Sequence, residues 1–423
     1  MIKRIVLVTY GSLGDLHPFL AVALGLQGRG HDVVLATSQN YRARVEEEGI
    51  AFQPVPPDLG LLEDDPQAIR RSMDLRTGTE FVVRSLFLPY LEQSYESLLA
   101  VCDGTDLIVG HPLAFAVPIV AQKLGIRWLS VGLQPMGFLS CYDPPVLPIA
   151  PWLAQLRFLG PLPYAVLFRL LEGVADGWLA PIENLRRRAG LPKSERHPLM
   201  HPFSPHGTLA WFSRVLAEPQ PDWPPRTQVT GFPFYDRAEP GQSGLDAGLA
   251  QFLDAGEPPV VFTLGSAAVW VAGNFYQESA AAAEALQLRA VLLVGRNPKI
   301  DFPDLASSRI HVGEYAPYSE LFGRSLAVVH QGGIGTTAQV LRAGRPMVVV
   351  PFSHDQPDNA ERARRLGVAR VIARRSYEGK RVARTLGELV QDQSAFKKAT
   401  AVASRIQSED GVAGACNAIE ALL

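Results

Sequence analysis

Short apolar segments that alternate with helix-like segments, in two separate series, constrain the fold of this chain most. Four such segments lie in the first half, at 4–10, 32–38, 106–111 and 127–132. Five more follow in the second half, at 259–266, 288–295, 326–333, 346–352 and 368–373. Strands that are apolar along their whole length are typical of parallel sheets covered by helices on both faces. The sequence therefore predicts an α/β protein with two doubly wound domains.

A segment rich in proline and polar residues separates the two series. It spans 218–244 and reads EPQPDWPPRTQVTGFPFYDRAEPGQSG, a composition typical of an interdomain linker. We therefore expect an N-terminal domain over 1–217 and a second domain over 245–393, and 423 residues suffice for two cores. Ligands of such sheets bind beyond the carboxyl ends of the strands, so we expect the two domains to face each other across a cleft.

Composition excludes several classes of protein. A formal net charge of −2 gives no basic surface for nucleic acid. Cys102, Cys141 and Cys416 are far apart and odd in number, which argues against a disulfide framework or a zinc site and favours the cytoplasm. The first apolar run is too short for a signal peptide. The most apolar later stretch, 146–171, is interrupted by prolines and arginines, so we expect no membrane insertion.

The segment VVHQGGIGTTAQVLRAGRPMVVVPFSHDQPDNA, at 328–360, carries the strongest chemical signal. A strand delivers His330 to its carboxyl end, and glycines and threonines then open a helix. These residues are Gly332, Gly333, Gly335, Thr336 and Thr337. Free amides and hydroxyls at a helix N-terminus favour an anion such as a phosphate. No lysine follows the glycines, so this is not a Walker P-loop. A tight turn without a ligand is the alternative.

A carboxylate and an amide, Asp355 and Gln356, stand side by side after the next strand. Together they offer acceptors and donors to paired sugar hydroxyls. The alternative is an N-cap, by Asp355 or by Asp358, for the helix that follows.

The run from EYAPYSELF through HQGGIGTTAQVLRAGRPMVVVPFSHDQPDNA resembles the donor-binding signature of family 1 glycosyltransferases, the UDP-glycosyltransferase superfamily with the GT-B fold. The opening segment GSLGDLHPFLAVALGLQGRGHDVVLATSQNYRARVEEEGIAFQPV is similar to the branch of bacterial antibiotic and sterol glycosyltransferases. The resemblance implies two Rossmann-like domains that face each other. It also implies C-terminal helices, over 394–423, that pack back on the N-terminal domain.

The resemblance also implies roles for single residues of the donor site. Tyr315 would stack on the nucleobase, and Ala316 would offer its backbone to the base edge. His330 and the loop to Thr336 would hold the diphosphate, with Ser266 reaching it from the other side. Asp355 and Gln356 would grip the sugar. Tyr318 and Ala338 replace a Gln and a ribose-binding Glu of the plant signature, so the choice between UDP and dTDP stays open.

The loop YGSLGDLHPFL after the first strand provides the candidate base. The family commonly places a catalytic His directly after the second glycine, and this chain has Asp15 there, as antibiotic-modifying relatives do. The position of the Asp that usually orients that His holds His111. We hypothesise that Asp15 and His111 share the work of removing the acceptor proton. Alternatively, Asp15 caps the first helix and His111 is a structural residue beside Pro112. His17 is a rival base.

The function expected from this resemblance is an inverting, metal-independent transfer of a hexose, glucose first among them, from UDP or dTDP. The acceptor would be a hydroxyl of a lipophilic small molecule such as a sterol, terpenoid, polyketide or flavonoid, because the middle of the chain is rich in apolar residues. No cofactor besides the sugar nucleotide is expected. A UDP-sugar epimerase of this fold and a catalytically silent partner protein are the alternatives, and the sequence leaves the oligomeric state open.

Overall fold

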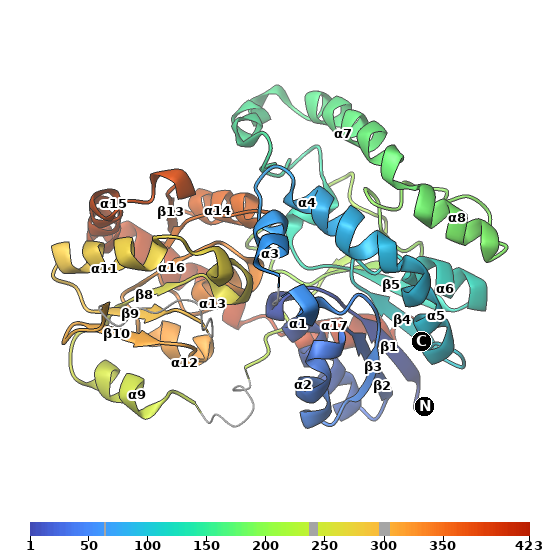
Figure 1. The fold of residues 1–423 in the computed structure, drawn as a ribbon, viewed down its shortest axis with the longest axis horizontal. Coiled ribbons are helices and arrows are strands. Elements are labelled where there is room, and N and C mark those ends of the chain that lie inside the picture. The colour runs from blue at the N-terminus through green and yellow to red at the C-terminus, as the bar shows by residue number, and fades with distance from the viewer. Residues whose placement is uncertain (63–64, 237–243, 296–304) are drawn as a thin grey trace. The chain divides into compact units, whose positions relative to one another are not determined.

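The computed structural model describes residues 1–62, 65–236, 244–295 and 305–423, and it divides into two compact units (Figure 1). The first unit holds Met1–Ser72, Arg76–Tyr235 and Glu409–Leu423. The second holds Met73–Leu75 and the described part of Asp236–Ser408. Each unit is a parallel sheet flanked by helices, as the continuous apolar strands predict.

The sheet of the first unit has the strand order β3-β2-β1-β4-β5-β6-β7, and every neighbouring pair is parallel. Its strands are β1 (Arg4–Val8), β2 (Asp32–Thr37), β3 (Ala51–Pro54), β4 (Leu107–Gly110), β5 (Arg127–Gly132), β6 (Thr208–Ala210) and β7 (Thr227–Val229). Its α-helices are α1 (Leu13–Gly28), α2 (Arg42–Glu47), α3 (Pro66–Ser72), α4 (Gly78–Phe81), α5 (Leu91–Val101), α6 (Val117–Leu124), α7 (Leu162–Ala175), α8 (Ala180–Arg188) and α17 (Gly411–Glu420). Because β1 and β4 are neighbours, the loops that follow them meet at one edge of the sheet.

The sheet of the second unit has the order β10-β9-β8-β11-β12-β13, again with parallel neighbours. Its strands are β8 (Val260–Thr263), β9 (Ala290–Leu293), β10 (Ile310–Gly313), β11 (Ala327–His330), β12 (Met347–Val349) and β13 (Ala369–Val371). Its α-helices are α9 (Ala247–Asp254), α10 (Gly265–Ala268), α11 (Phe275–Ala285), α12 (Tyr318–Leu321), α13 (Ile334–Arg342), α14 (Gln356–Arg365), α15 (Gly379–Gln391) and α16 (Gln393–Gln407). The strands β8, β11 and β12 are adjacent, so the loops after them share an edge.

The structure divides the chain differently from the predicted linker at 218–244. Strand β7 lies inside that range and pairs with β6, and the first unit ends at Tyr235. The polar composition that suggested a linker comes in part from an edge strand whose side chains are partly exposed. Residues 237–243 of the predicted linker lie outside the described residues.

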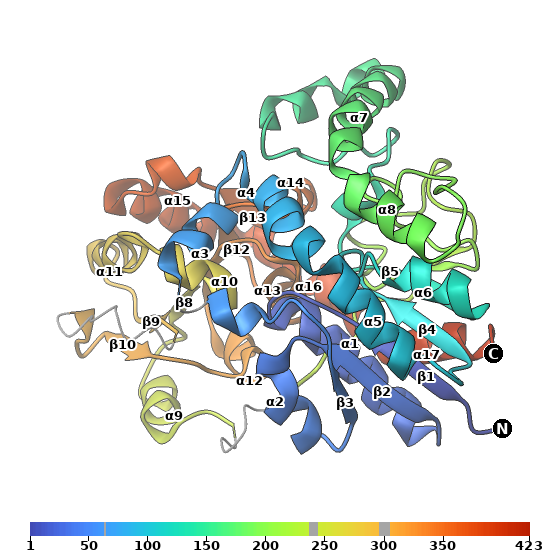
Figure 2. The ribbon, with the colours of Figure 1, turned by 45° about the vertical axis from the view of Figure 1, so that its right-hand side comes forward.

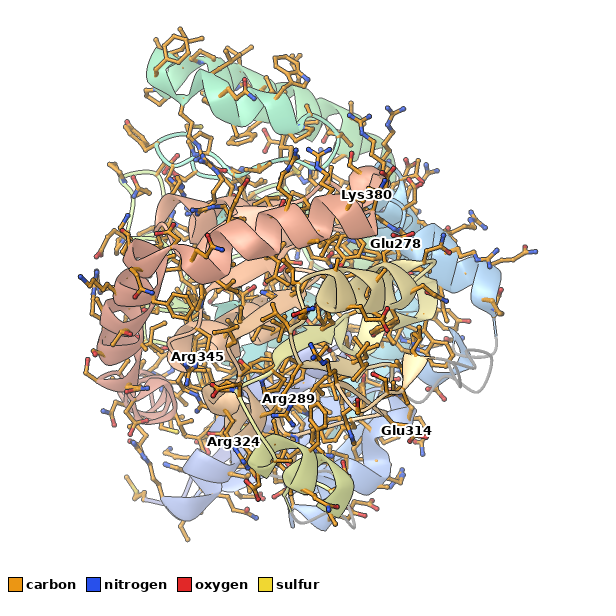
Figure 3. All side chains as sticks on the ribbon, turned by 90° about the vertical axis from the view of Figure 1, so that its left-hand side faces the viewer. Glu278, Arg289, Glu314, Arg324, Arg345 and Lys380 are labelled. Atoms are coloured by element: carbon orange, nitrogen blue, oxygen red, sulfur yellow. The ribbon has the colours of Figure 1, made fainter. Side chains whose placement is uncertain are left out.

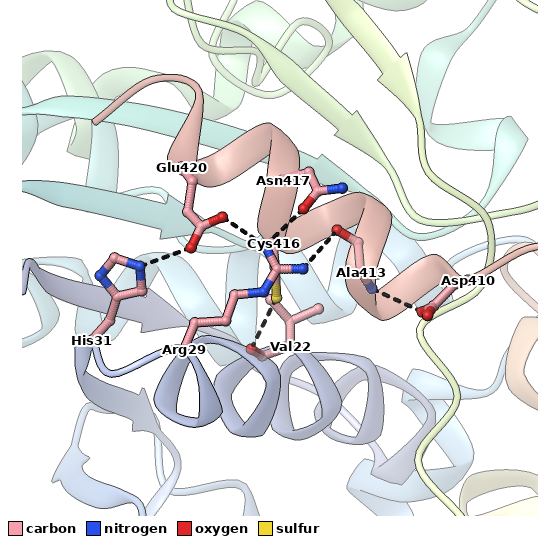
Figure 4. A network of polar contacts seen from close by, with 8 residues as sticks. All are labelled: Val22, Arg29, His31, Asp410, Ala413, Cys416, Asn417 and Glu420. Carbon is pink, nitrogen blue, oxygen red and sulfur yellow. Dashed lines mark hydrogen bonds and ion pairs between the residues drawn. The ribbon is translucent and has the colours of Figure 1, made fainter.

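The C-terminal segment 394–423 also divides. Helix α16 belongs to the second unit, and only the segment from Glu409 belongs to the first. There α17 packs along α1, where Arg29 and His31 both contact Glu420 at 2.6 and 3.0 Å and Cys416 packs against Val22 (Figure 4). Helix α17 thus lies on the N-terminal unit, whereas α16 is part of the second unit.

Candidate active site

The loop after β1 places a carboxylate at the start of α1. Ser12 is the N-cap of this helix, and its backbone N–H donates to Asp15 Oδ2 at 2.8 Å in a capping box. Gly11 has a φ of +119°, and a Cβ there would lie 2.2 Å from Asp15 Oδ2, so the turn requires glycine. The N-cap alternative for Asp15 is thus wrong in detail, since Ser12 is the cap and Asp15 is its partner. The capping contacts hold the carboxylate in one orientation.

The structure brings Asp15 and His111 together. His111 follows β4, and its Nε2 lies 3.4 Å from Asp15 Oδ1. Its Nδ1 accepts a hydrogen bond of 3.1 Å from the backbone N–H of Leu113. Because Nδ1 is an acceptor, the ring proton of the neutral imidazole resides on Nε2, the nitrogen that lies nearer to the carboxylate. The His111 side chain is 6% exposed and that of Asp15 30%, so Asp15 is the member of the pair that solvent and a ligand can reach.

His17, the predicted rival base, lies apart from this pair and packs against Tyr235. Residues two apart on a helix point about 200° away from each other, and the ring of His17 packs 4.9 Å from that of Tyr235. Its Nε2 is buried and has no hydrogen-bond partner within the described residues. Burial, and then the charge of Arg44, lower the pKa of His17 to about 3. A histidine held neutral and covered in this way is a poor proton acceptor.

A small pocket lies beside the loops that carry the pair. It is lined by Tyr10 before the capping loop, by Leu113 and Phe115 after His111, and by Phe87 and Leu91. The rings of Tyr10 and Phe87 meet edge to face at 5.3 Å. Tyr10, Phe87, Leu91 and Phe115 are all buried parts of the hydrophobic core of this unit.

In the second unit, the loop predicted to bind an anion lies between β11 and α13. Gly332 has a φ of +93°, and a Cβ there would lie 2.7 Å from Val349 Cγ1, so this position also requires glycine. Gly333 is the N-cap residue, and Gly335 and Thr336 lie in the first turn of α13. The first amides of a helix have no partner within it, so they are available to an anion at this end.

His330 does not take the position that was predicted for a diphosphate ligand. Its side chain is fully buried, its Nδ1 accepts from the backbone N–H of Gly332 at 3.1 Å, and its Nε2 lies 3.3 Å from Met347 Sδ. Burial lowers the pKa of His330 to about 3. The imidazole is therefore neutral, and its hydrogen bond with Gly332 stabilises the conformation of the glycine loop.

Two buried amide side chains of this unit were missed by the sequence analysis, and Gln331 is the first. It is 7% exposed, and its Oε1 has no partner within the described part of the chain. Its Nε2 lies 2.5 Å from where a Cβ on Gly265 would stand and 2.9 Å from one on Gly333. Gln331 thus occupies the space between the loops after β8 and β11. Ser266, the predicted second contact to the diphosphate, follows Gly265 and is exposed on α10.

The predicted nucleobase segment precedes α12. Tyr315 is half-buried and Ala316 is buried. The hydroxyl group of Tyr318 lies 2.8 Å from Thr263 Oγ1 and also bonds Thr336, while its ring stacks on Phe322 at 4.4 Å. Burial raises the pKa of Tyr318. Tyr318 therefore ties the end of β8 to the first turn of α13 and supports the anion site from within.

The predicted sugar pair begins α14. Asp355 makes no capping bond through its side chain, and Asp358 forms a buried ion pair with Arg362 at 2.7 Å, so neither is the N-cap by side chain. Gln356 is 6% exposed, and its Oε1 accepts from the backbone N–H groups of Phe352 and Ser353 at 2.7 and 3.1 Å. The oxygen of Gln356 is thus engaged by its own loop.

Asn359 is the second amide that the sequence analysis missed. It is fully buried, and its Nδ2 donates to Asp355 Oδ2 at 2.6 Å and to the carbonyl oxygen of Gly332 at 2.9 Å. The first bond orients the candidate sugar carboxylate, and the second fixes the glycine loop. Asn359 therefore couples the two loops. The sequence could have predicted its contact with Asp355, because it stands four residues after Asp355 on the same helical face.

Cationic side chains of the second unit take part in contacts of the fold. Arg289 donates to the carbonyl oxygen of Glu257 at 2.7 Å, Arg324 pairs with Asp254, and Arg345 donates to the carbonyl oxygen of Gly323. Figure 3 labels these three arginines on the ribbon. Within the residues that the structure describes, no group of three or more His, Cys, Asp and Glu side chains is placed to hold a metal ion.

Known proteins match this chain along its whole length. Residues 5–128 match the model of the glycosyltransferase family 28 N-terminal domain, and residues 291–422 match that of the erythromycin biosynthesis protein CIII-like C-terminal domain. The O-mycaminosyltylonolide 6-deoxyallosyltransferase of Streptomyces fradiae is 34% identical over 99% of this chain and 97% of its own length. The sterol 3-beta-glucosyltransferase UGT80A2 of Arabidopsis thaliana is 27% identical over 98% of this chain. The chain spans 65% of that plant protein and 26% to 34% of similar fungal sterol glucosyltransferases.

Solved structures define the fold class as GT-B. The glycosyltransferase of kitacinnamycin has a TM-score of 0.74 at 22% identity, covering 100% of this chain and 99% of its own. The glycosyltransferase VinC in complex with dTDP has a TM-score of 0.66 at 19% identity, covering 99% of each chain. With the Streptomyces relative, these matches show that the chain belongs to the family 1 glycosyltransferases and is a hexosyltransferase. They give no support to the epimerase alternative. Because the chain is an enzyme, the alternative of a catalytically silent partner protein is wrong.

Within the described ranges, no helix is both long enough and apolar enough to cross a bilayer.

Proposed function

We propose that this enzyme transfers a hexose from a nucleoside diphosphate sugar to a hydroxyl group of a lipophilic small molecule, with inversion at the anomeric carbon. The observation that carries the proposal is the contact of 3.4 Å between Asp15 Oδ1 and the protonated Nε2 of His111, at the edge of the first sheet.

In this mechanism Asp15 is the general base. The acceptor oxygen attacks the anomeric carbon while its proton passes to the Asp15 carboxylate, and the bond from that carbon to the diphosphate breaks with its electron pair. His111 donates its Nε2–H to the same carboxylate and keeps it oriented. It is not the base, because its free nitrogen already accepts from Leu113.

The second unit would serve the leaving group and the sugar. Negative charge builds on the diphosphate as the bond breaks, and the free amides at the start of α13 with the hydroxyl group of Thr336 stabilise it. Asp355, oriented by Asn359, accepts hydrogen bonds from sugar hydroxyls. Tyr315 and Ala316 receive the nucleobase. The reaction needs no metal and no cofactor besides the sugar nucleotide.

The relatives suggest the substrates. The names of similar proteins describe a 6-deoxyallose transfer to a macrolide and glucose transfers to sterols, and VinC was solved with dTDP. For this chain we propose a UDP- or dTDP-hexose, glucose first, and a polycyclic or macrocyclic acceptor with a free hydroxyl group.

The test is a product assay with UDP-glucose and dTDP-glucose against hydroxylated sterols, macrolides and flavonoids, with and without EDTA. We expect a hexosylated product, a β-configured anomeric centre from the α-configured donor by NMR, and no loss of rate with EDTA. Retention of the donor's configuration would refute the single-displacement mechanism. Loss of activity with EDTA, restored by a divalent cation, would refute the metal-independent step.

A further inference from the structure

Helix α7 exposes an apolar stripe along its outer face. Leu162, Val166, Leu170 and Val174 recur every four residues and are 78%, 62%, 66% and 63% exposed. Residues four apart lie on one side of a helix, so the four side chains form one line. Phe158 at 79% and Leu159 at 52% exposure precede the helix, and we call these six residues the α7 stripe.

The helix itself is anchored by its other face. Tyr164 is buried and donates from its hydroxyl group to the carbonyl oxygen of Leu153 at 2.6 Å. Glu172 lies 3.3 Å from His201 Nε2, and Asp176, just after the helix, lies 3.7 Å from His197 Nε2. Figures 1 and 2 agree that α7 stands away from the sheet of its own unit. The position of the helix is thus set from within, and its stripe remains outside.

The exposed area is large for an isolated molecule. At roughly 100 to 150 Å² for each large, mostly exposed apolar side chain, the α7 stripe exposes about 600 to 900 Å². The largest apolar patch of a typical monomer is about 300 to 600 Å². A standard protein–protein interface buries about 800 Å² of each partner. The exposed area of the stripe is therefore comparable with what each partner of a standard interface buries.

We propose that the α7 stripe is the contact surface of a homodimer in which two copies of α7 pack antiparallel around a two-fold axis near Phe168. Leucine and valine alternate along the stripe, so this arrangement sets Leu162 opposite Val174 of the partner subunit and Val166 opposite Leu170 of the partner subunit. Each large side chain then meets a smaller one, which is the complementarity that an isologous interface needs. Gly173 lies between the stripe residues and permits close approach.

The charges on the helix favour a second copy over a membrane surface. Helices that lie on a membrane carry many Lys and Arg residues on their polar face. Helix α7 has one Arg and one Glu, Arg169 and Glu172, and Glu172 is paired with His201. A helix with no net charge is not attracted to anionic lipid. Apolar packing against a second copy of the helix does not require such an attraction.

Light scattering coupled to gel filtration tests the proposal on the full chain. We expect the wild type to have twice the 46.0 kDa mass of one chain at micromolar concentration. Leu170→Glu puts a charge at the centre of the stripe and should yield the single-chain mass with an unchanged circular dichroism spectrum. The matched control is Ile2→Glu, because Ile2 is also an aliphatic residue at 78% exposure but lies outside the stripe. This variant should remain dimeric.

Cysteine cross-linking in a Cys141→Ser background tests the direction of packing. Arg169→Cys lies beside the two-fold axis and should form a disulfide-linked dimer under mild oxidation. Leu162→Cys should not, because in the antiparallel arrangement its two copies are about 18 Å apart at 1.5 Å of rise per residue. Cross-linking at 162 in place of 169 would overturn the antiparallel arrangement. A monomeric wild type, a Leu170→Glu variant that stays dimeric, or a monomer that sediments with phosphatidylcholine vesicles through the stripe would overturn the proposal.

Discussion

Substitution of Asp15 by Asn removes the proposed general base and leaves the rest of the enzyme intact. The amide has the shape of the carboxylate, and its oxygen can still accept from the backbone N–H of Ser12, which is 2.8 Å from Asp15 Oδ2. Its NH₂ group would then face the Nε2–H of His111, which lies 3.4 Å from Oδ1, so two donors meet. The variant loses both the proton acceptor and its favourable contact with His111.

The expected magnitude follows from these two losses. General-base catalysis contributes about 10² to 10⁴ in rate, so we expect kcat to fall by at least about 100-fold. Loss of a negative charge in the first turn of α1 costs about 0.3 to 1 kcal/mol of folding free energy, which leaves the protein folded. The KM for the sugar nucleotide should stay within about threefold, because the residues proposed to bind it belong to the second unit.

The assay is the initial rate of nucleotide diphosphate release with saturating acceptor, together with thermal shifts on adding UDP or dTDP. The matched control is Asp410→Asn, because Asp410 also caps a helix of the first unit by accepting from Ala413 N–H at 2.8 Å. That control should keep its rate. An Asp15→Asn variant with a rate within threefold of the wild type would refute the assignment of the base.

Three further substitutions test the orientation of the base, the coupling of two loops and the burial of His17. His111→Phe removes the Nε2 donor to Asp15 and should lower kcat about 10-fold or more without changing the donor KM, as steady-state kinetics would measure; an unchanged kcat argues against orientation by His111. Asn359→Asp sets a second carboxylate 2.6 Å from that of Asp355 and removes the bond to the carbonyl oxygen of Gly332, so the donor KM should rise at least about 10-fold while the acceptor KM stays constant; equal donor KM values would contradict the coupling. The pKa of His17 is lowered to about 3 in the folded protein, so below pH 6.5 the unfolded state binds a proton that the native state does not bind. The free energy of unfolding therefore decreases as the pH is lowered. Measured by urea unfolding, the free energy of unfolding should decrease between pH 7 and pH 5 by about 2 kcal/mol less for His17→Leu than for the wild type. Equal decreases would contradict the burial of a neutral ring.

The two sheets could be predicted because their central strands carry their own signal. The strands β1, β4 and β11 are mostly apolar and almost wholly buried, so the sequence pattern alone locates them. The short strands β6 and β7 have three residues each, and β7 is polar and partly exposed, so its sequence reads as a loop. Strand β7 forms because it pairs with β6, and its local sequence pattern does not indicate that pairing.

The contact between Asp15 and His111 could likewise be expected, since the loops after adjacent parallel strands share an edge. The orientation of the other histidines could not. The neighbours that fix His330 and His17 are Met347 and Tyr235, which lie 17 and 218 residues further along the chain.

The buried amides were missed for a related reason. Gln331 and Asn359 act on backbone groups and glycines of loops other than their own. A side chain with that task leaves no charge pattern and no periodicity in the sequence, so only the three-dimensional placement of the loops reveals it.

The most direct test of the central claim is mass spectrometry of acceptor mixtures incubated with UDP-glucose or dTDP-glucose and either the wild type or Asp15→Asn. We expect a hexose mass increment on at least one lipophilic acceptor with the wild type, and a yield at least about 100-fold lower with the variant, which should still bind the free nucleotide. Equal yields from the two proteins would contradict the central claim.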